Sequence, residues 1–146
     1  MVILHKIYAF NLPHFELVQI YVIFIRAVVE QSAVVWHAAL TEEEHNTIER
    51  VQKVALKIIF NQDYIDYENE LKLSNLKTLM ERRDFLCLKF AKRCVSKETG
   101  ADMFPVNTKT VNTRPHEKYF VQPANTERLR KSAIPYMQRL LNLNYN

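Results

Sequence analysis

The chain has 146 residues, of which 48% are apolar and 25% charged, as in a globular domain rather than a disordered segment. Its only glycine is Gly100, which excludes glycine-rich phosphate loops and tight two-residue hairpin turns. Residues 1–70 hold 5 Lys/Arg and 10 Asp/Glu, whereas residues 71–146 hold 15 and 6. The basic second half favours an anionic partner, with nucleic acid first, although a surface with excess lysine would give the same composition.

Residues 1–12 show no clear pattern. Pro13 suits a helix start and predicts a first helix over about 14–30. This segment is apolar nearly all round, so we expect it to be buried on more than one side; its β-branched residues leave a strand as an alternative. The apolar run 17–25 is too short to span a bilayer, and no cleavage site for a signal peptide follows the first ten residues, so no membrane partner is expected.

Two helices have clear starts in the sequence. Thr41 with Glu44, and Thr78 with Glu81, have the spacing of capping boxes. The helix after Thr41 is expected to bury Ile48, Val51, Ala55 and Ile58 and to present Arg50, Lys53 and Lys57 on a separate face. Between these two helices, Asp63 is expected to cap a short helix.

The helix after Thr78 should run to about Ser96. Its expected buried stripe is Leu79, Leu86, Phe90 and Cys94, widened by Met80 and by Leu88 or Phe85. Three basic residues at spacings of seven and four form one line along this helix: Arg82, Lys89 and Arg93. Arg83 and Lys92 flank that line. So many bases with few acids favour a nucleic-acid contact, although a solvated face would also fit.

Residues 97–125 have no sustained period and are rich in Asn, Thr and Pro, which predicts an irregular connection. A last helix is expected over 126–142, with a break near Ile134 caused by Pro135. Just before this break, the sequence clusters three bases, Arg128, Arg130 and Lys131. The whole pattern predicts an all-α fold of four to five helices, with an N-terminal segment 1–12, a bundle over 13–96, and the C-terminal helix packing back on that bundle.

No set of catalytic residues can be assembled from the sequence. The five histidines are scattered along the sequence, so for each one a surface or core position is favoured over a role as a ligand. Cys87 and Cys94 would lie about 10 Å apart along one helix, too far for a disulfide, so they are expected to be reduced cysteines of an intracellular protein. Neither a cofactor nor a metal is expected, and the sequence does not separate a nuclear from a cytoplasmic location.

Four runs are familiar as an ordered set: "IRAVVEQSAVVWHAALT", "IERVQKVALKII", "LSNLKTLMERRDFLCLKFAKRC" and "TERLRKSAIPYMQRLLN". Together they resemble the region that follows the catalytic palm in reverse transcriptases of non-long-terminal-repeat retrotransposons, especially jockey-like elements. The likeness covers roughly residues 11–142. It implies a thumb-like helical region and an RNA, DNA or RNA–DNA hybrid partner.

The resemblance also implies that the fingers and palm would lie upstream of Met1, so that the chain is a noncatalytic fragment of an RNA-directed DNA polymerase and the palm itself is a possible partner. We therefore expect phosphate contacts from eight bases: Arg82, Arg83, Lys89, Lys92, Arg93, Arg128, Arg130 and Lys131. The alternative is a helical protein-interaction module that does not bind nucleic acid.

Overall fold

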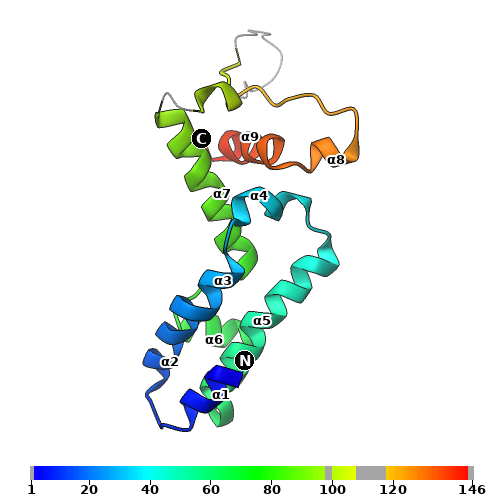
Figure 1. Cartoon of the computed structure of the whole chain (residues 1–146). Coiled ribbons are helices and arrows are strands. Elements are labelled where there is room, and N and C mark those ends of the chain that lie inside the picture. Colours follow the sequence, from blue (N-terminus) through cyan, green and yellow to red (C-terminus); the bar gives the residue numbers. More distant parts are fainter. Residues whose placement is uncertain (1, 98–99, 108–117, 145–146) are drawn as a thin grey trace. The chain divides into compact units, whose positions relative to one another are not determined.

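Helices make up the regular structure of the computed structural model, which describes residues 2–97, 100–107 and 118–144 (Figure 1). The all-α prediction is therefore confirmed. The first helices are α1 (Val2–Tyr8), α2 (His14–Ile20), the π-helix η1 (Tyr21–Arg26), α3 (Ala27–Val29), α4 (Ala33–Trp36) and the 3-10 turn η2 (His37–Ala39). They are followed by α5 (Glu42–Phe60), η3 (Asn61–Asp63), α6 (Tyr67–Leu73), α7 (Leu79–Ser96), η4 (Ala101–Met103), α8 (Glu127–Arg130) and α9 (Ala133–Leu143).

The chain forms two compact units instead of the single bundle expected over 13–96. Unit 1 comprises residues 1–31 and 41–82, and unit 2 comprises residues 32–40 and 83–146. Helix α7 is shared, because its first turn belongs to unit 1 and the rest to unit 2. The division also separates charge: unit 1 holds 8 Lys/Arg and 11 Asp/Glu, whereas unit 2 holds 12 Lys/Arg and 5 Asp/Glu. Unit 2 therefore carries a net charge of +7.

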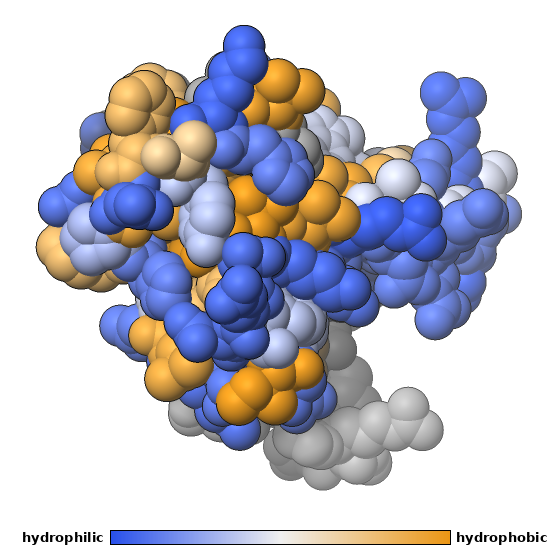
Figure 2. Space-filling view, turned by 90° about the horizontal axis from the view of Figure 1, so that it is seen from below, coloured by the Kyte–Doolittle hydropathy of each residue, from blue (hydrophilic) through white to orange (hydrophobic). Residues whose placement is uncertain are grey.

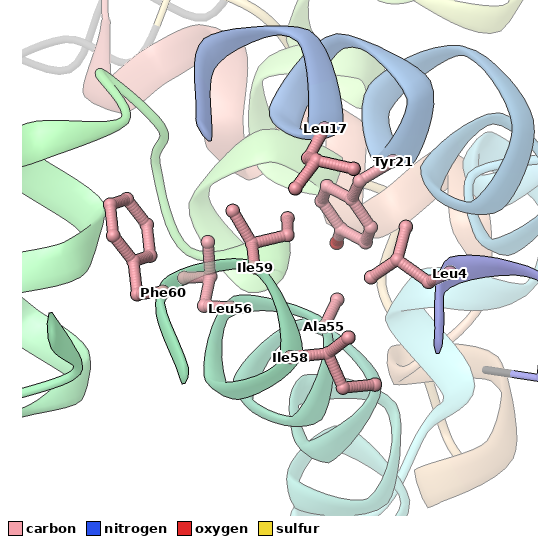
Figure 3. Packing of buried hydrophobic residues seen from close by; sticks show 8 residues of the cluster. All are labelled: Leu4, Leu17, Tyr21, Ala55, Leu56, Ile58, Ile59 and Phe60. Atoms are coloured by element: carbon pink, nitrogen blue, oxygen red, sulfur yellow. The ribbon is translucent and has the colours of Figure 1, made fainter. Parts of the chain in front are cut away.

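The core of unit 1 forms where α1 and α2 pack on the C-terminal half of α5 (Figure 3). The buried side chains of this core come from these helices and from η1: Leu4, Leu17, Tyr21, Ala55, Leu56, Ile58, Ile59 and Phe60. Residues 1–12, which showed no pattern in the sequence, thus supply a helix whose Leu4 is part of the core. Of the stripe expected on α5, Ala55 and Ile58 are buried, and Ile48 and Val51 are half-buried.

A chain of hydrogen bonds crosses this core. The Tyr21 hydroxyl donates to the Gln52 amide oxygen at 2.9 Å, and the Gln52 amide nitrogen donates to the Tyr67 hydroxyl at 3.0 Å. The Tyr67 hydroxyl donates in turn to the Glu49 carboxylate, which also accepts the Leu79 backbone N–H at 3.1 Å. Because buried polar groups are costly unless they are paired, this chain of bonds fixes how η1, α5, α6 and the start of α7 meet.

The segment 14–29 is helical, so the strand alternative is wrong. It is not buried on more than one side, as its composition led us to expect. Leu17 and Tyr21 face the core, but four large apolar side chains are more than half exposed: Phe15, Ile23, Phe24 and Val28. Figure 2 shows apolar side chains lying open beside hydrophilic ones on the face seen from below.

Helix α7 is turned about its axis relative to the expected stripe. Its buried side chains recur every four residues, at Leu79, Arg83, Cys87 and Ala91. Residues at this spacing lie on one face of a helix, so this register turns other residues outward. Phe90, which was expected in the buried stripe, is 41% exposed.

The core of unit 2 brings α7 and α9 together, and α9 also packs on α4 and η2. Cys87 and Ala91 of α7 meet Met137 and Leu141 of α9. The predicted break in the last helix exists, but it lies at residues 131–132 rather than near Ile134. Pro135 is tolerated in the first turn of α9, where a backbone N–H would lack an intrahelical acceptor.

Helix ends follow the local chemistry of the chain. The capping boxes of Thr41 with Glu44 and of Thr78 with Glu81 are both formed. Asp66, rather than the expected Asp63, caps α6, by accepting the Asn69 backbone N–H at 2.7 Å. With one glycine in the chain, positive φ angles at turns fall mainly to asparagine, namely Asn11, Asn61 and Asn75, whose side chains tolerate that conformation.

The connection expected over 97–125 is irregular in its described parts. It contains the short turn η4 and one isolated antiparallel bridge between Val106 and Tyr119. Gly100, with φ of 96°, enters η4 in a left-handed conformation that glycine adopts freely. Residues 98–99 and 108–117 lie outside the described residues.

Candidate nucleic-acid interface

The exposed face of α7 in unit 2 carries three bases. Lys89, Lys92 and Arg93 are exposed, and none of them forms an ion pair within the part of the chain that the structure describes. At about 100° per residue they fall within an arc of about 100°, on the side of the helix opposite Cys87 and Ala91. Their charges are thus uncompensated and available to an anionic partner.

Arg82 occupies a different environment. It belongs to unit 1, where its Nε donates to Glu30 Oε1 at 3.1 Å. Glu30 is largely buried and also pairs with Arg26 at 3.4 Å. Because a carboxylate already offsets the charge of Arg82, it is a weaker candidate for a phosphate contact than Lys89 or Arg93.

Arg83 does not lie on the surface, and the expectation that it contacts phosphate is wrong. Its side chain is fully buried because residue 83 falls on the line of α7 that faces the core. The guanidinium Nε donates to His37 Nδ1 at 3.2 Å, and its central carbon lies 5.8 Å from the centroid of the Trp36 ring. Arg83 is therefore a structural residue that holds α4 and η2 against α7.

His37, Asp84 and Tyr136 form a polar cluster in unit 2 that sequence analysis did not find. His37 Nε2 lies 2.6 Å from Asp84 Oδ1, which also accepts a hydrogen bond from the Tyr136 hydroxyl. Since Arg83 donates to Nδ1, the ring carries its hydrogen on Nε2 and donates it to Asp84. The three residues lie up to 99 positions apart, and no spacing in the sequence signals their meeting.

The cluster shifts the pKa values of Asp84 and Tyr136. Burial would raise the pKa of Asp84, but hydrogen bonds from His37 and Tyr136 outweigh burial and hold that pKa below its ordinary value. Burial and the neighbouring Asp84 carboxylate raise the pKa of Tyr136. His37 is only 1% exposed, which removes its ring from contact with a substrate, so the cluster serves to join α7, α9 and η2.

A second group of bases surrounds α8. Arg128, Arg130 and Lys131 are all exposed, as expected, and Thr126 caps the helix. Glu127, however, pairs with both Arg130 and Lys131, and the hydrogen bond from Arg130 lowers the pKa of Glu127. Arg128 retains the least compensated charge of the three.

The basic end of α5 is occupied by aromatic rings of its own unit. Lys53 Nζ lies 5.1 Å from the centroid of Tyr67, and Lys57 Nζ lies 5.6 Å from that of Tyr64. Arg50 is exposed. The cation–π contacts of Lys53 and Lys57 within unit 1 account for the basic residues at this end of α5, which is therefore a poorer candidate for an anion contact than α7.

No protein-family model, no curated protein and no solved structure matches this chain. In the described part of the chain, no three His, Cys, Asp or Glu side chains gather as a metal ion would need. Within the same residues, no single helix is long and apolar enough to cross a membrane, although the bent pair His14–Val29 and Ala33–Ala39 passes by length and composition alone.

Proposed function

We propose that this chain is a noncatalytic nucleic-acid-binding protein that contacts the phosphates of RNA, DNA or an RNA–DNA hybrid through unit 2. The observation that carries the proposal is the uncompensated base triplet Lys89, Lys92 and Arg93 on α7. Arg128 at α8 adds to the same positive field, and Arg130 and Lys131 contribute less because Glu127 pairs with them. Arg82 belongs to unit 1, where Glu30 offsets its charge. The resemblance to the post-palm region of retrotransposon reverse transcriptases is consistent with this partner.

Phosphate contacts give affinity without reading sequence, and each contact releases counterions. Binding should therefore be nonspecific and should weaken steeply as salt is added. Because unit 1 has a net charge of −3, the interaction should depend on unit 2 and not on the charge of the whole chain.

The test is fluorescence anisotropy of the purified chain with a short RNA–DNA hybrid over a salt series. Replacing Lys89, Lys92 and Arg93 with alanine should flatten the slope of log K against log salt by roughly 2 to 3, since each lost phosphate contact accounts for about 0.7–0.9.

The matched control replaces Lys6, Arg50 and Lys72 with alanine. These are exposed bases of unit 1, so the control removes the same charge from the other unit. It should leave the slope nearly unchanged. Equal effects of the two triple variants would show that only net charge matters, and an unchanged slope in the α7 variant would refute the proposal.

A second candidate function is a protein-interaction module, favoured by the exposed apolar side chains of helix 14–29. An open groove of about 550 Å³ adjoins this helix and is lined by Phe15, Val18, Phe60 and Leu73. Exposed apolar side chains that adjoin a groove are typical of a contact surface. Sedimentation in which the mass rises with concentration, and in which Phe24→Ser abolishes the rise, would support this candidate.

A further inference from the structure

Two phenylalanines are exposed beside the bases of α7. Phe85 is 49% and Phe90 is 41% exposed, although Phe90 was expected in the buried stripe and Phe85 was an alternative to Leu88 at its margin. The register that buries Arg83, Cys87 and Ala91 turns these rings outward. Each belongs to unit 2, as the base triplet does.

One ring lies among Lys89, Lys92 and Arg93 on the helix surface, and the other lies beside them: Phe85 falls at an angle between those of Lys92 and Lys89. Phe85 lies one turn before Lys89 and about 40° to one side of it, and residues at this spacing have Cβ atoms about 5–6 Å apart. Phe90 lies about 60° beyond Arg93, at one edge of the arc of bases. The exposed surface of α7 thus presents its cations with one aromatic ring, Phe85, among them and a second, Phe90, at one edge.

This combination suits a strand whose bases are free. A base pair in a duplex is stacked on its neighbours, so only its edges and the phosphates are accessible, and an exposed ring gains little from it. In a single strand, the phosphates can contact the lysine and arginine side chains while unpaired nucleobases stack on the phenylalanine rings. Aromatic stacking of this kind tolerates any base, because every base has a π-face.

We infer that α7 binds single-stranded nucleic acid in preference to duplex or hybrid, with Phe85 and Phe90 as stacking platforms beside Lys89 and Arg93. The inference rests on the proposed function and adds the class of ligand to it.

The experiment compares three fluorescent probes at one low salt concentration: a single strand of about 12 nucleotides, the matching RNA–DNA hybrid, and an abasic strand of the same length. The wild-type chain should bind the single strand most tightly. Replacing Phe85 and Phe90 with leucine should weaken that binding by roughly tenfold while leaving the abasic strand unaffected, because leucine keeps an apolar side chain but cannot stack.

The matched control is Phe15→Leu with Phe24→Leu, which changes two rings in unit 1 that are even more exposed than Phe85 and Phe90. It should bind all three probes as the wild type does. Equal binding of the single strand by wild type and the α7 phenylalanine variant would overturn the inference, as would tighter binding of the hybrid. If the lysine and arginine variant of α7 still loses its salt dependence in that case, the proposed function survives and only the stacking is wrong.

Discussion

Replacing Asp84 with asparagine isolates the charge at the centre of the unit 2 cluster. The substitution keeps the shape of the side chain but turns an ionised acceptor into a neutral one. Asp84 Oδ1 accepts hydrogen bonds from His37 and from Tyr136. Hydrogen bonds to charged groups contribute about 1.5–3 kcal/mol each, and neutral ones about 0.5–1.5 kcal/mol.

The expected loss is therefore about 1 kcal/mol for each of the two bonds. The Asp84 side chain is 34% exposed, so solvent screening reduces this sum, and we expect Asp84→Asn to lower the free energy of unfolding of unit 2 by about 1–2 kcal/mol at pH 7. The loss should also depend on pH. Because folding lowers the pKa of Asp84, its stabilisation is present above about pH 4 and disappears as the pH falls through the folded pKa.

Trp36 provides the assay. It is the only tryptophan of the chain, and it lies in unit 2 beside Arg83, so its emission reports the unfolding of this unit in urea. The exposed Asp102→Asn serves as the charge-matched control and should change the midpoint little. The reasoning is refuted if Asp84→Asn is as stable as the wild type at pH 7, or if its deficit is as large at pH 3 as at pH 7.

Three further predictions concern stability and reactivity. Thr41→Ala should lower the free energy of unfolding of unit 1 by about 1 kcal/mol, because it removes the acceptor for the Glu44 backbone N–H. Thermal melting followed by the helical circular dichroism signal measures this loss, and an unchanged melting temperature would contradict it. Leu56→Ala should cost about 2–5 kcal/mol in urea unfolding, since the side chain is fully buried in the unit 1 core, and a loss below about 1 kcal/mol would place Leu56 outside that core. Burial raises the pKa of the Cys87 thiol to about 11, so a thiol reagent at pH 8 should modify Cys94 first. Mass spectrometry of the labelled peptides measures the two rates. Faster labelling of Cys87 would argue against its burial.

Helix starts were the most predictable features of the fold. The capping boxes at Thr41 and Thr78 involve atoms three residues apart, so the residues that form them are adjacent in the sequence. The neighbouring error, Asp63 in place of Asp66, has a local cause as well: either aspartate could cap a helix in this stretch, and the turn η3 settles the choice.

The candidate site was only partly predictable. The outward position of Lys89, Lys92 and Arg93 was expected, because lysine and arginine side chains are costly to bury. Arg83 violates that rule, and its burial depends on His37 and Trp36, which lie more than 45 residues earlier in the chain. No pattern within α7 distinguishes it from Arg82, the base next to it.

The sequence by itself determined the helical class of this protein, the starts of its two longest helices and the basic character of its second half. These properties depend on composition and on contacts within a few residues. Only the tertiary structure decided which face of α7 is buried. The large apolar residues of α7 are distributed around its circumference, so several orientations of the helix would bury some of them. The packing of α9, α4 and η2 against α7 selects the register with Cys87 and Ala91 inside. The same orientation buries Arg83 and leaves Phe85 and Phe90 partly exposed beside the basic residues Lys89, Lys92 and Arg93.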